Sequence, residues 1–268
     1  MNATARPSFK ALLEFAHSLA DLSGNAINPY FRKTIEVTNK APQGAYDPVT
    51  AADRAAEQVI GRAVGARWPD HGVIGEEFGS TREDARLKWV IDPIDGTRSF
   101  IMGSPLWGTL IGLLDSETAV LGVMDQPFTQ ERFWSGAQAT YFRRAEGRAR
   151  RIRTRRCPHL GDAILSTTHP DLFAKGKEAD SFARLKANTR MTRYGGDCYA
   201  YCLLAAGFID AVVETGLNAY DVVALIPIIE RAGGRITTWE GKPATSGGRI
   251  IAAGDPRLHE KALAILAR

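Results

Sequence analysis

One stretch, WVIDPIDGT at residues 89–97, limits what this chain can fold into more than any other. Apolar residues run into Asp92, and Pro93 cannot donate a hydrogen bond in a central strand, so we expect a buried strand that stops near Asp92. Gly96 permits a tight turn after a second carboxylate, Asp95. Two acids at the end of a buried strand are unfavourable unless positive charge compensates them. A divalent cation with oxygen ligands meets that need, so the stretch predicts a metal site.

The composition is that of a globular chain with a sizeable core. The chain has 268 residues, of which 44% are hydrophobic and 24% are charged, and this length allows one large domain or two fused layers. Three cysteines without a C-x-x-C pair indicate neither a disulfide framework nor a zinc knuckle, so we expect a reducing cytoplasm. The sequence shows no signal-peptide pattern and no apolar window long enough to span a membrane, so we expect no membrane partner.

The N-terminal half, residues 1–145, is expected to be an α+β unit. Apolar spacing predicts a helix over residues 9–27 and a second helix that opens at Thr50. Residues 33–45 read as a strand or loop with a mobile tip. Short apolar runs predict strands at residues 73–77, 106–114, 119–124 and 131–134, which would form an antiparallel sheet with helices on one side.

The C-terminal half, residues 146–268, is expected to be an α/β unit because its strand and helix patterns alternate. The predicted strands cover residues 163–167, 191–194, 209–214, 235–238 and 250–253. The predicted helices cover residues 180–187, 198–206, 219–232 and 256–267.

Three further groups of polar side chains stand at strand ends or helix starts. Glu76 and Glu77 end a short predicted strand, and a solvated turn is their ordinary structural explanation. Asp221 opens a helix, where an acid interacts favourably with the helix dipole. Thr50 and Asp53 have the spacing of a capping box at a helix start. None of these positions indicates a shared site from its local context alone.

Taken in order, four motifs resemble the inositol monophosphatase family. They are DPVTAAD at residues 47–53, IGEE at 74–77, WVIDPIDGT at 89–97 and YDVVA at 220–224. Members of that family are magnesium-dependent, lithium-sensitive phosphomonoesterases, commonly homodimers. The resemblance covers nearly the whole chain. It implies the layered αβαβα sandwich of the inositol monophosphatase and fructose bisphosphatase type, with the α+β half carrying most metal ligands.

The resemblance also implies a set of metal ligands. Glu76, Asp92 and the main-chain carbonyl of Ile94 would hold the first Mg²⁺, and Asp92, Asp95 and Asp221 would hold the second. A third, looser ion would rest on Glu76. All-oxygen ligation suits a hard cation, so Mn²⁺ is a possible substitute and Li⁺ is an expected inhibitor.

Two residues carry the chemistry that the resemblance implies. Thr97, paired with Asp53, would orient and activate the attacking water, so that metal-activated water displaces the leaving group without a phosphoenzyme. The backbone amides of Gly96 and Thr97 would point at the phosphate if they open a helix, as they do in the family.

Substrate choice is expected to depend on the C-terminal half. The segment RYGGDCYAY at residues 193–201 resembles the family's substrate loop, and Glu214 aligns with an acid that contacts a ring hydroxyl in the inositol enzymes. Asp197 stands where those enzymes usually have a small hydroxyl residue, and an acid there favours a cationic leaving group. An ordinary helix N-cap is the alternative for Asp197. The expected substrate-binding residues are Gly96, Thr97, Arg193, Gly196, Asp197, Glu214 and Asp221.

Several segments resemble the histidinol-phosphate phosphatase branch in particular. They are SPLWGTL at residues 104–110, LGVMDQP at 121–127, GGDCYAY at 195–201 and NAYDVVALIP at 218–227. The resemblance therefore implies hydrolysis of L-histidinol phosphate to L-histidinol and phosphate in histidine biosynthesis. The rival substrates are inositol 1-phosphate, which would make the protein an inositol-1-monophosphatase, and a 3′-phosphoadenosine nucleotide.

A different class of function would use the arginine run between Arg143 and Arg156, which holds eight arginines in fourteen residues. Such a run can bind nucleic acid through phosphates. A solvated hairpin between the halves is the structural explanation, and reach into a neighbouring subunit's active site is a third. We expect the hairpin, a small phosphate monoester as substrate and no nucleic-acid partner.

Overall fold

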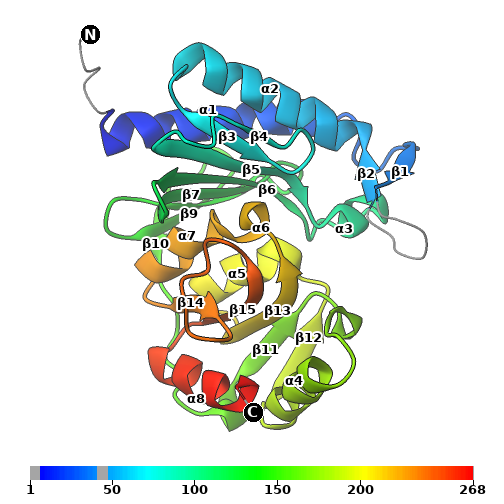
Figure 1. Ribbon diagram of the computed structural model, residues 1–268, viewed down its shortest axis with the longest axis vertical. Coiled ribbons are helices and arrows are strands. Elements are labelled where there is room, and N and C mark those ends of the chain that lie inside the picture. The colour runs from blue at the N-terminus through cyan, green and yellow to red at the C-terminus, as the bar shows by residue number, and fades with distance from the viewer. Residues whose placement is uncertain (1–6, 41–47, 268) are drawn as a thin grey trace.

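The computed structural model describes residues 7–40 and 48–267. Its elements stack as five layers, helix, sheet, helix, sheet and helix, from the N-terminal half at the top of Figure 1 to the C-terminal half at the bottom. This arrangement confirms the expected αβαβα sandwich. The tip of the predicted 33–45 segment and Asp47 of the first motif lie outside the described residues. Within the described ranges, no helix is both long and apolar enough to cross a bilayer.

The first sheet has eight strands in the order β10-β9-β8-β7-β6-β5-β3-β4. Its strands are β3 (Gly72–Gly75), β4 (Ser80–Thr81), β5 (Leu87–Asp95), β6 (Gly108–Asp115), β7 (Thr118–Gln126), β8 (Glu131–Ser135), β9 (Thr140–Arg144) and β10 (Arg150–Ile152). The expectation of a purely antiparallel sheet is wrong at one pair, because β3 and β5 run parallel. The short β4 pairs antiparallel with the edge of β3 that faces away from β5. After β4 the chain passes to the other edge of β3, and β5 then runs parallel to β3.

The arginine run forms the hairpin of β9 and β10, so strands of the first sheet continue past residue 145. Arg144, Arg148, Arg150 and Arg151 of this hairpin are exposed to solvent.

Two helices, α1 (Phe9–Ile27) and α2 (Ala51–Arg67), cover the outer face of this sheet. Apolar residues at helical spacing in α1, such as Leu12 and Leu19, pack with Ile60 of α2 against Ile91 and Ile111 of the sheet. Beside them, β1 (Val37–Asn39) and β2 (Pro48–Thr50) form a separate two-stranded ribbon. The apolar spacing of residues 9–27 therefore gives the bounds of the first helix correctly.

The second sheet has five strands in the order β12-β11-β13-β15-β14. They are β11 (Ile164–Thr167), β12 (Met191–Tyr194), β13 (Ala211–Leu217), β14 (Arg235–Thr238) and β15 (Gly248–Ala253). Helices α4 (Lys177–Ala187) and α8 (Pro256–Leu266) cover its outer face. Between the two sheets lie α5 (Asp197–Ala205), α6 (Ala219–Val222) and α7 (Leu225–Arg231), which share one apolar core with both.

Two local predictions differ from the structure. The strand expected to stop near Asp92 continues to Asp95. Asp92 pairs with Leu110 and Asp95 pairs with Gly108, so β5 has one residue more than β6 between these two pairs and forms a bulge. The bulge accommodates Pro93 outside the regular ladder. The single helix expected over residues 219–232 is broken into α6 and α7. Pro227 has no N–H to donate to the carbonyl of Val223, which explains the break.

Candidate metal centre

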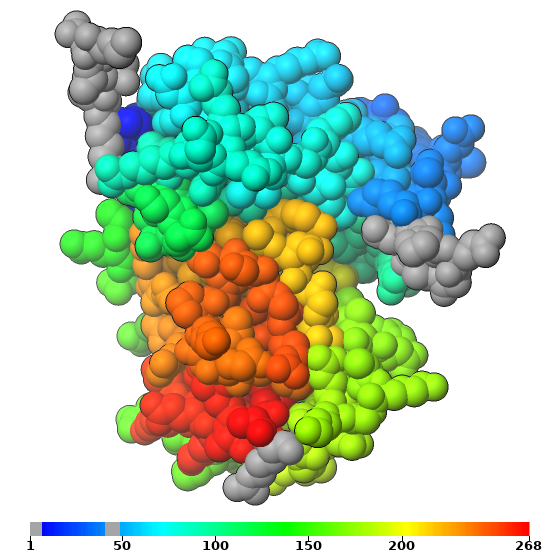
Figure 2. Space-filling view, in the orientation of Figure 1, coloured from blue at the N-terminus to red at the C-terminus, as the bar shows by residue number. Residues whose placement is uncertain are grey.

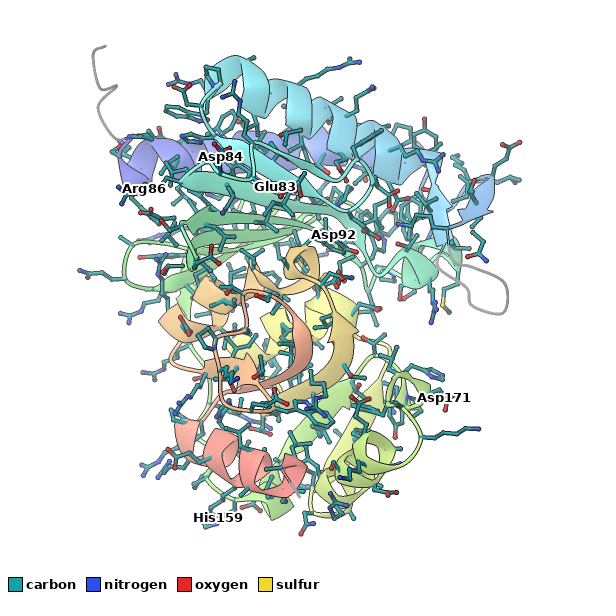
Figure 3. The ribbon with its side chains drawn as sticks, viewed as in Figure 1. Glu83, Asp84, Arg86, Asp92, His159 and Asp171 are labelled. Atoms are coloured by element: carbon teal, nitrogen blue, oxygen red, sulfur yellow. The ribbon has the colours of Figure 1, made fainter. Side chains whose placement is uncertain are left out.

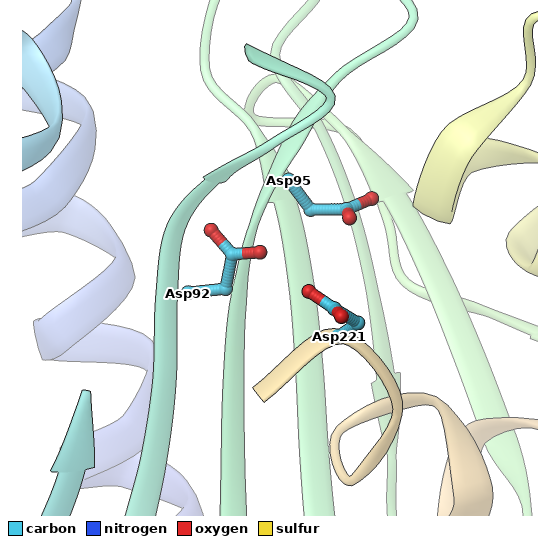
Figure 4. Close-up of side chains that lie close together, drawn as sticks. All are labelled: Asp92, Asp95 and Asp221. Atoms are coloured by element: carbon cyan, nitrogen blue, oxygen red, sulfur yellow. The ribbon is translucent and has the colours of Figure 1, made fainter. Parts of the chain in front are cut away.

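Three carboxylates from the two halves of the chain meet where the first sheet packs on the central helices. Asp92 and Asp95 come from the bulge of β5, and Asp221 comes from α6 (Figure 4). Each offers an oxygen, and these oxygens all lie within 4.8 Å of one another. In Figure 3, Asp92 lies at the boundary between the two halves. In Figure 2, the gold surface near α6 meets the cyan surface of the N-terminal half along this boundary.

In this cluster the buried carboxylates disfavour one another's ionisation. Burial, followed by the charges of Glu76, Asp95 and Asp221, raises the pKa of Asp92 well above its usual range. Burial and neighbouring carboxylates act in the same way on Asp95, and they raise the pKa of Asp221 to about 7. An all-oxygen donor set that is destabilised when ionised fits a hard divalent cation.

The bulge also fixes the backbone around Ile94. The N–H of Ile94 donates to Oδ1 of Asp92 at 2.9 Å, and its carbonyl accepts a hydrogen bond from Thr97 Oγ1 at 3.1 Å. Thr109 Oγ1 donates to the carbonyl of Pro93 at 2.8 Å and anchors the bulge to β6. The predicted carbonyl ligand therefore lies in the turn that links the two aspartates.

Glu76 and Glu77 lie in the turn between β3 and β4, at the edge of the cluster. Lys40 Nζ contacts Glu76 Oε1 at 2.9 Å and Glu77 Oε1 at 2.8 Å. The charge of Glu76 acts on both Asp92 and Asp221, so the turn belongs to the same electrostatic group. The ammonium of Lys40 places a positive charge beside these two glutamates. No sequence pattern indicated this pairing.

Asp53 and Thr97 flank the cluster without a hydrogen bond between them. Asp53 closes the predicted capping box, because its Oδ2 accepts from the N–H and Oγ1 of Thr50 at 2.8 and 2.5 Å. Its other oxygen, Oδ1, is buried and has no partner in the described part of the chain. Burial raises the pKa of Asp53 to about 6. Thr97 is the first residue of the short helix α3 (Thr97–Ile101), which Gly96 precedes with a φ of 90°.

The structure places Asp197 directly beside Gly96, at the start of α3. A Cβ on Gly96 would lie 3.2 Å from the Asp197 side chain, and Ser99 Oγ donates to Asp197 Oδ2 at 2.9 Å. The N-cap alternative for Asp197 is wrong, because Gly196 is the N-cap of α5 and Asp197 is its first residue, with a φ of 41°. Its carboxylate is thus directed by Ser99, a residue that the sequence did not single out.

Glu214 lies deeper, on β13. Its Oε1 accepts from the N–H and Oγ1 of Thr168 at 2.9 and 2.5 Å, and its Oε2 accepts from Tyr201 at 3.0 Å. Burial, with a contribution from the charge of Asp197, raises the pKa of Glu214 to about 7. Thr168 follows a predicted strand but belongs to no motif, so its role could not be read from the sequence.

The remaining predicted substrate residues differ in their surroundings. Gly196 has a structural reason to be glycine, because a Cβ there would lie 2.7 Å from Ala200 Cβ. Arg193 is exposed on β12, and its side chain forms no hydrogen bond or ion pair with another described residue. The structure thus brings Asp197 and Glu214 near the carboxylate cluster and leaves Arg193 outside its contacts.

A five-layer αβαβα sandwich with a carboxylate cluster between its halves is the architecture of a metal-dependent phosphatase. A profile of the inositol monophosphatase family matches residues 9–268, and the chain belongs to this family. It is therefore a phosphoric monoester hydrolase of the inositol monophosphatase type, and members of this family depend on metal ions.

Relatives with different named activities resemble the chain. It is 43% identical to the bifunctional phosphatase IMPL2 of Arabidopsis thaliana, over 92% of this chain and 72% of that protein. It is 34% identical to a histidinol-phosphatase of Mycobacterium tuberculosis, over 81% and 83% of the two chains. It is 35% identical to an inositol-1-monophosphatase of Caulobacter vibrioides, over 82% and 88%.

Among solved structures, an inositol monophosphatase from Zymomonas mobilis matches with a TM-score of 0.86 and 42% identity, over 98% of this chain and 100% of that chain.

Proposed function

We propose that the protein hydrolyses L-histidinol phosphate to L-histidinol and phosphate in histidine biosynthesis. The observation that carries this proposal is the pair of acids beside the metal centre, Asp197 and Glu214. Burial raises the pKa of both, and the charge of Asp197 further disfavours ionisation of Glu214, so a cationic group on the substrate would stabilise the ionised pair. Histidinol phosphate carries an amine and an imidazole, whereas inositol phosphate carries only neutral hydroxyls beside its phosphate. Relatives named histidinol-phosphatase, at 31–34% identity, support the same substrate.

The proposed ligands of Mg²⁺ are Glu76, Asp92, the Ile94 carbonyl, Asp95 and Asp221. When bound, two or three such ions would neutralise the phosphate, lower the pKa of a water and stabilise the leaving oxygen. Mn²⁺ would substitute for Mg²⁺, and Li⁺ would inhibit.

The chain's own groups would do the rest of the work. Thr97 Oγ1 already donates to a carbonyl, so its oxygen can accept a hydrogen bond from the attacking water. The unpartnered Oδ1 of Asp53 can accept a proton or hydrogen bond from that region. Asp197, positioned by Ser99, and Glu214, positioned by Thr168 and Tyr201, would orient the cationic end of the substrate.

A second candidate substrate is inositol 1-phosphate, because relatives with that named activity match most of the chain. The same metal centre would act on either ester, so the two candidates differ only in what the acids of the C-terminal half recognise.

The deciding experiment is phosphate release with Mg²⁺ from L-histidinol phosphate, myo-inositol 1-phosphate and 3′-phosphoadenosine 5′-phosphate, side by side. We expect the highest kcat/KM with L-histidinol phosphate. A higher value with the inositol ester would transfer the assignment to the second candidate.

We further propose that the enzyme acts in the cytoplasm as a homodimer, with no nucleic-acid partner. The three cysteines, all buried and unpaired, support a reducing compartment. Family resemblance supports the dimer, which light scattering of the purified protein would test.

A further inference from the structure

Glu57 lies one helical turn after Asp53 on α2, and none of the chemistry above uses it. Its side chain is buried, with only 4% of the residue exposed. Oε2 accepts a hydrogen bond from the N–H of Glu77 at 2.8 Å, and Oε1 accepts one from the N–H of Phe78 at 2.9 Å. A buried carboxylate therefore holds two consecutive amides of the turn that carries Glu76.

Gly75 makes this contact possible. A Cβ at that position would lie 1.9 Å from Glu57 Oε1, so any larger residue would displace the carboxylate. Gly75 does not have a positive φ, so the requirement for glycine here is one of space. Its N–H donates to the carbonyl of Gly79 at 3.0 Å and closes the same turn. The turn is thus fixed by one backbone hydrogen bond and by one side chain from α2.

The charge of Glu57 is unfavourable where it stands. Burial, together with the charges of Glu77 and Glu76, raises its pKa above the usual range. A neutral glutamine would avoid that repulsion, but it offers a single acceptor oxygen, and its amide N–H groups would face one of the turn's N–H groups. Only a carboxylate can accept from both amides, and such charge-assisted hydrogen bonds are the strong ones.

We propose that Glu57 is a positioning residue for the metal centre, which fixes the turn of Glu76 and so sets the affinity for the divalent cation. Without it, repulsion between Glu76 and the carboxylates of Asp92 and Asp221 would favour withdrawal of the turn from the cluster. The inference rests on the proposed function, because it takes Glu76 to be a metal ligand. Groups that orient metal ligands typically change metal affinity by about 10- to 100-fold when they are replaced.

Calorimetric titration of the metal-free protein with Mg²⁺ tests this role. We expect Glu57→Gln to raise the Kd for Mg²⁺ by at least about tenfold. Asp210→Asn is the matched control, because Asp210 is 1% exposed and accepts from the backbone N–H of Ile164 at 2.7 Å. It directly precedes β13, at the opposite end of that strand from α6 and Asp221. That variant should lose stability without a change in Kd.

Gly75→Ala disturbs the same contact through a clash with the Glu57 carboxylate. It provides a second test if Glu57→Gln folds poorly. We expect it to weaken Mg²⁺ binding in the wild-type background and to add little in a Glu57→Ala background, where the clash is gone. A wild-type Kd in both Glu57→Gln and Gly75→Ala would overturn the positioning role and leave the metal site intact. Equal binding by the wild type and Glu76→Gln would instead overturn the metal assignment and the inference with it.

Discussion

Replacement of Asp197 by asparagine isolates the charge that we propose to select the substrate. Asparagine keeps the size of the side chain, and its Oδ1 can still accept the hydrogen bond from Ser99, so the variant removes one negative charge with little other change. Loss of one partner from a buried charge pair costs about 2–5 kcal/mol. Asp197 is only partly buried and Glu214 remains as a second acid, so we expect a cost in the lower part of this range, about 2–3 kcal/mol. That free energy corresponds to a loss of about 30- to 150-fold in kcat/KM for L-histidinol phosphate.

The assay is steady-state phosphate release at saturating Mg²⁺ with two substrates, L-histidinol phosphate and myo-inositol 1-phosphate. The neutral inositol ester gains nothing from the charge, so its kcat/KM should hold or rise. Ser99→Ala serves as the matched control, because it removes the hydrogen bond to Asp197 and keeps the charge. It should cost less than Asp197→Asn on the cationic substrate. Equal losses on both substrates for Asp197→Asn would refute the reasoning.

Three further predictions concern the metal centre and the pH dependence of stability. Asp92→Asn should abolish turnover of every substrate while the metal-free protein melts no lower than wild type, because repulsion in the cluster is reduced; substantial activity would contradict the metal assignment. Chelation should remove activity and lower Tm, and Mg²⁺ at 100 times its Kd should restore about 2.7 kcal/mol of stability; an unchanged Tm would argue against a metal site between the halves. His259 is fully buried, and burial lowers its pKa to about 4, so the stability tied to its neutral form is present above pH 6.5 and is lost as pH falls toward 4. Burial also lowers the pKa of His17 to about 4, so the variant keeps that contribution. Between pH 7 and pH 5, the loss of unfolding free energy should be about 2 kcal/mol smaller in His259→Gln than in wild type; the same pH slope in both would exclude His259 as a source.

The fold was largely predictable because most of its elements have a clear periodicity. The spacing of Leu12, Ala16 and Leu19 gave the first helix its bounds, and the four motifs gave the layered architecture. The bulge at Pro93 was not predictable from local rules, because a proline ordinarily indicates the end of a strand. It can lie within a strand where the partner strand has one residue fewer, and that depends on β6, which lies later in the chain. The break at Pro227 could have been found, because a proline inside a helical pattern removes an identifiable hydrogen bond.

The site was predictable only as far as its motifs reach. Asp92, Asp95 and Asp221 could be grouped through the resemblance, although spacing alone says nothing about the proximity of Asp221 to a strand so far before it. Lys40 and Thr168 could not be found, because a lysine and a threonine that each follow a short strand have no pattern of their own. Their roles depend on contacts across the fold.

The hairpin of β9 and β10 has a consequence for the molecule as a whole. Residues 143–156 contain eight arginines and one glutamate, a net charge of +7, whereas the entire chain carries +4. The remainder of the protein therefore has a net charge of −3, and the basic pI of about 9.0 is the property of one hairpin and its continuation. The positive charge is concentrated at one side of the molecule, where β9 and β10 lie in Figure 1, so the protein should orient in an electric field and adsorb to a cation exchanger through that side. Its isoelectric point describes that side and says little about the surface that a substrate meets.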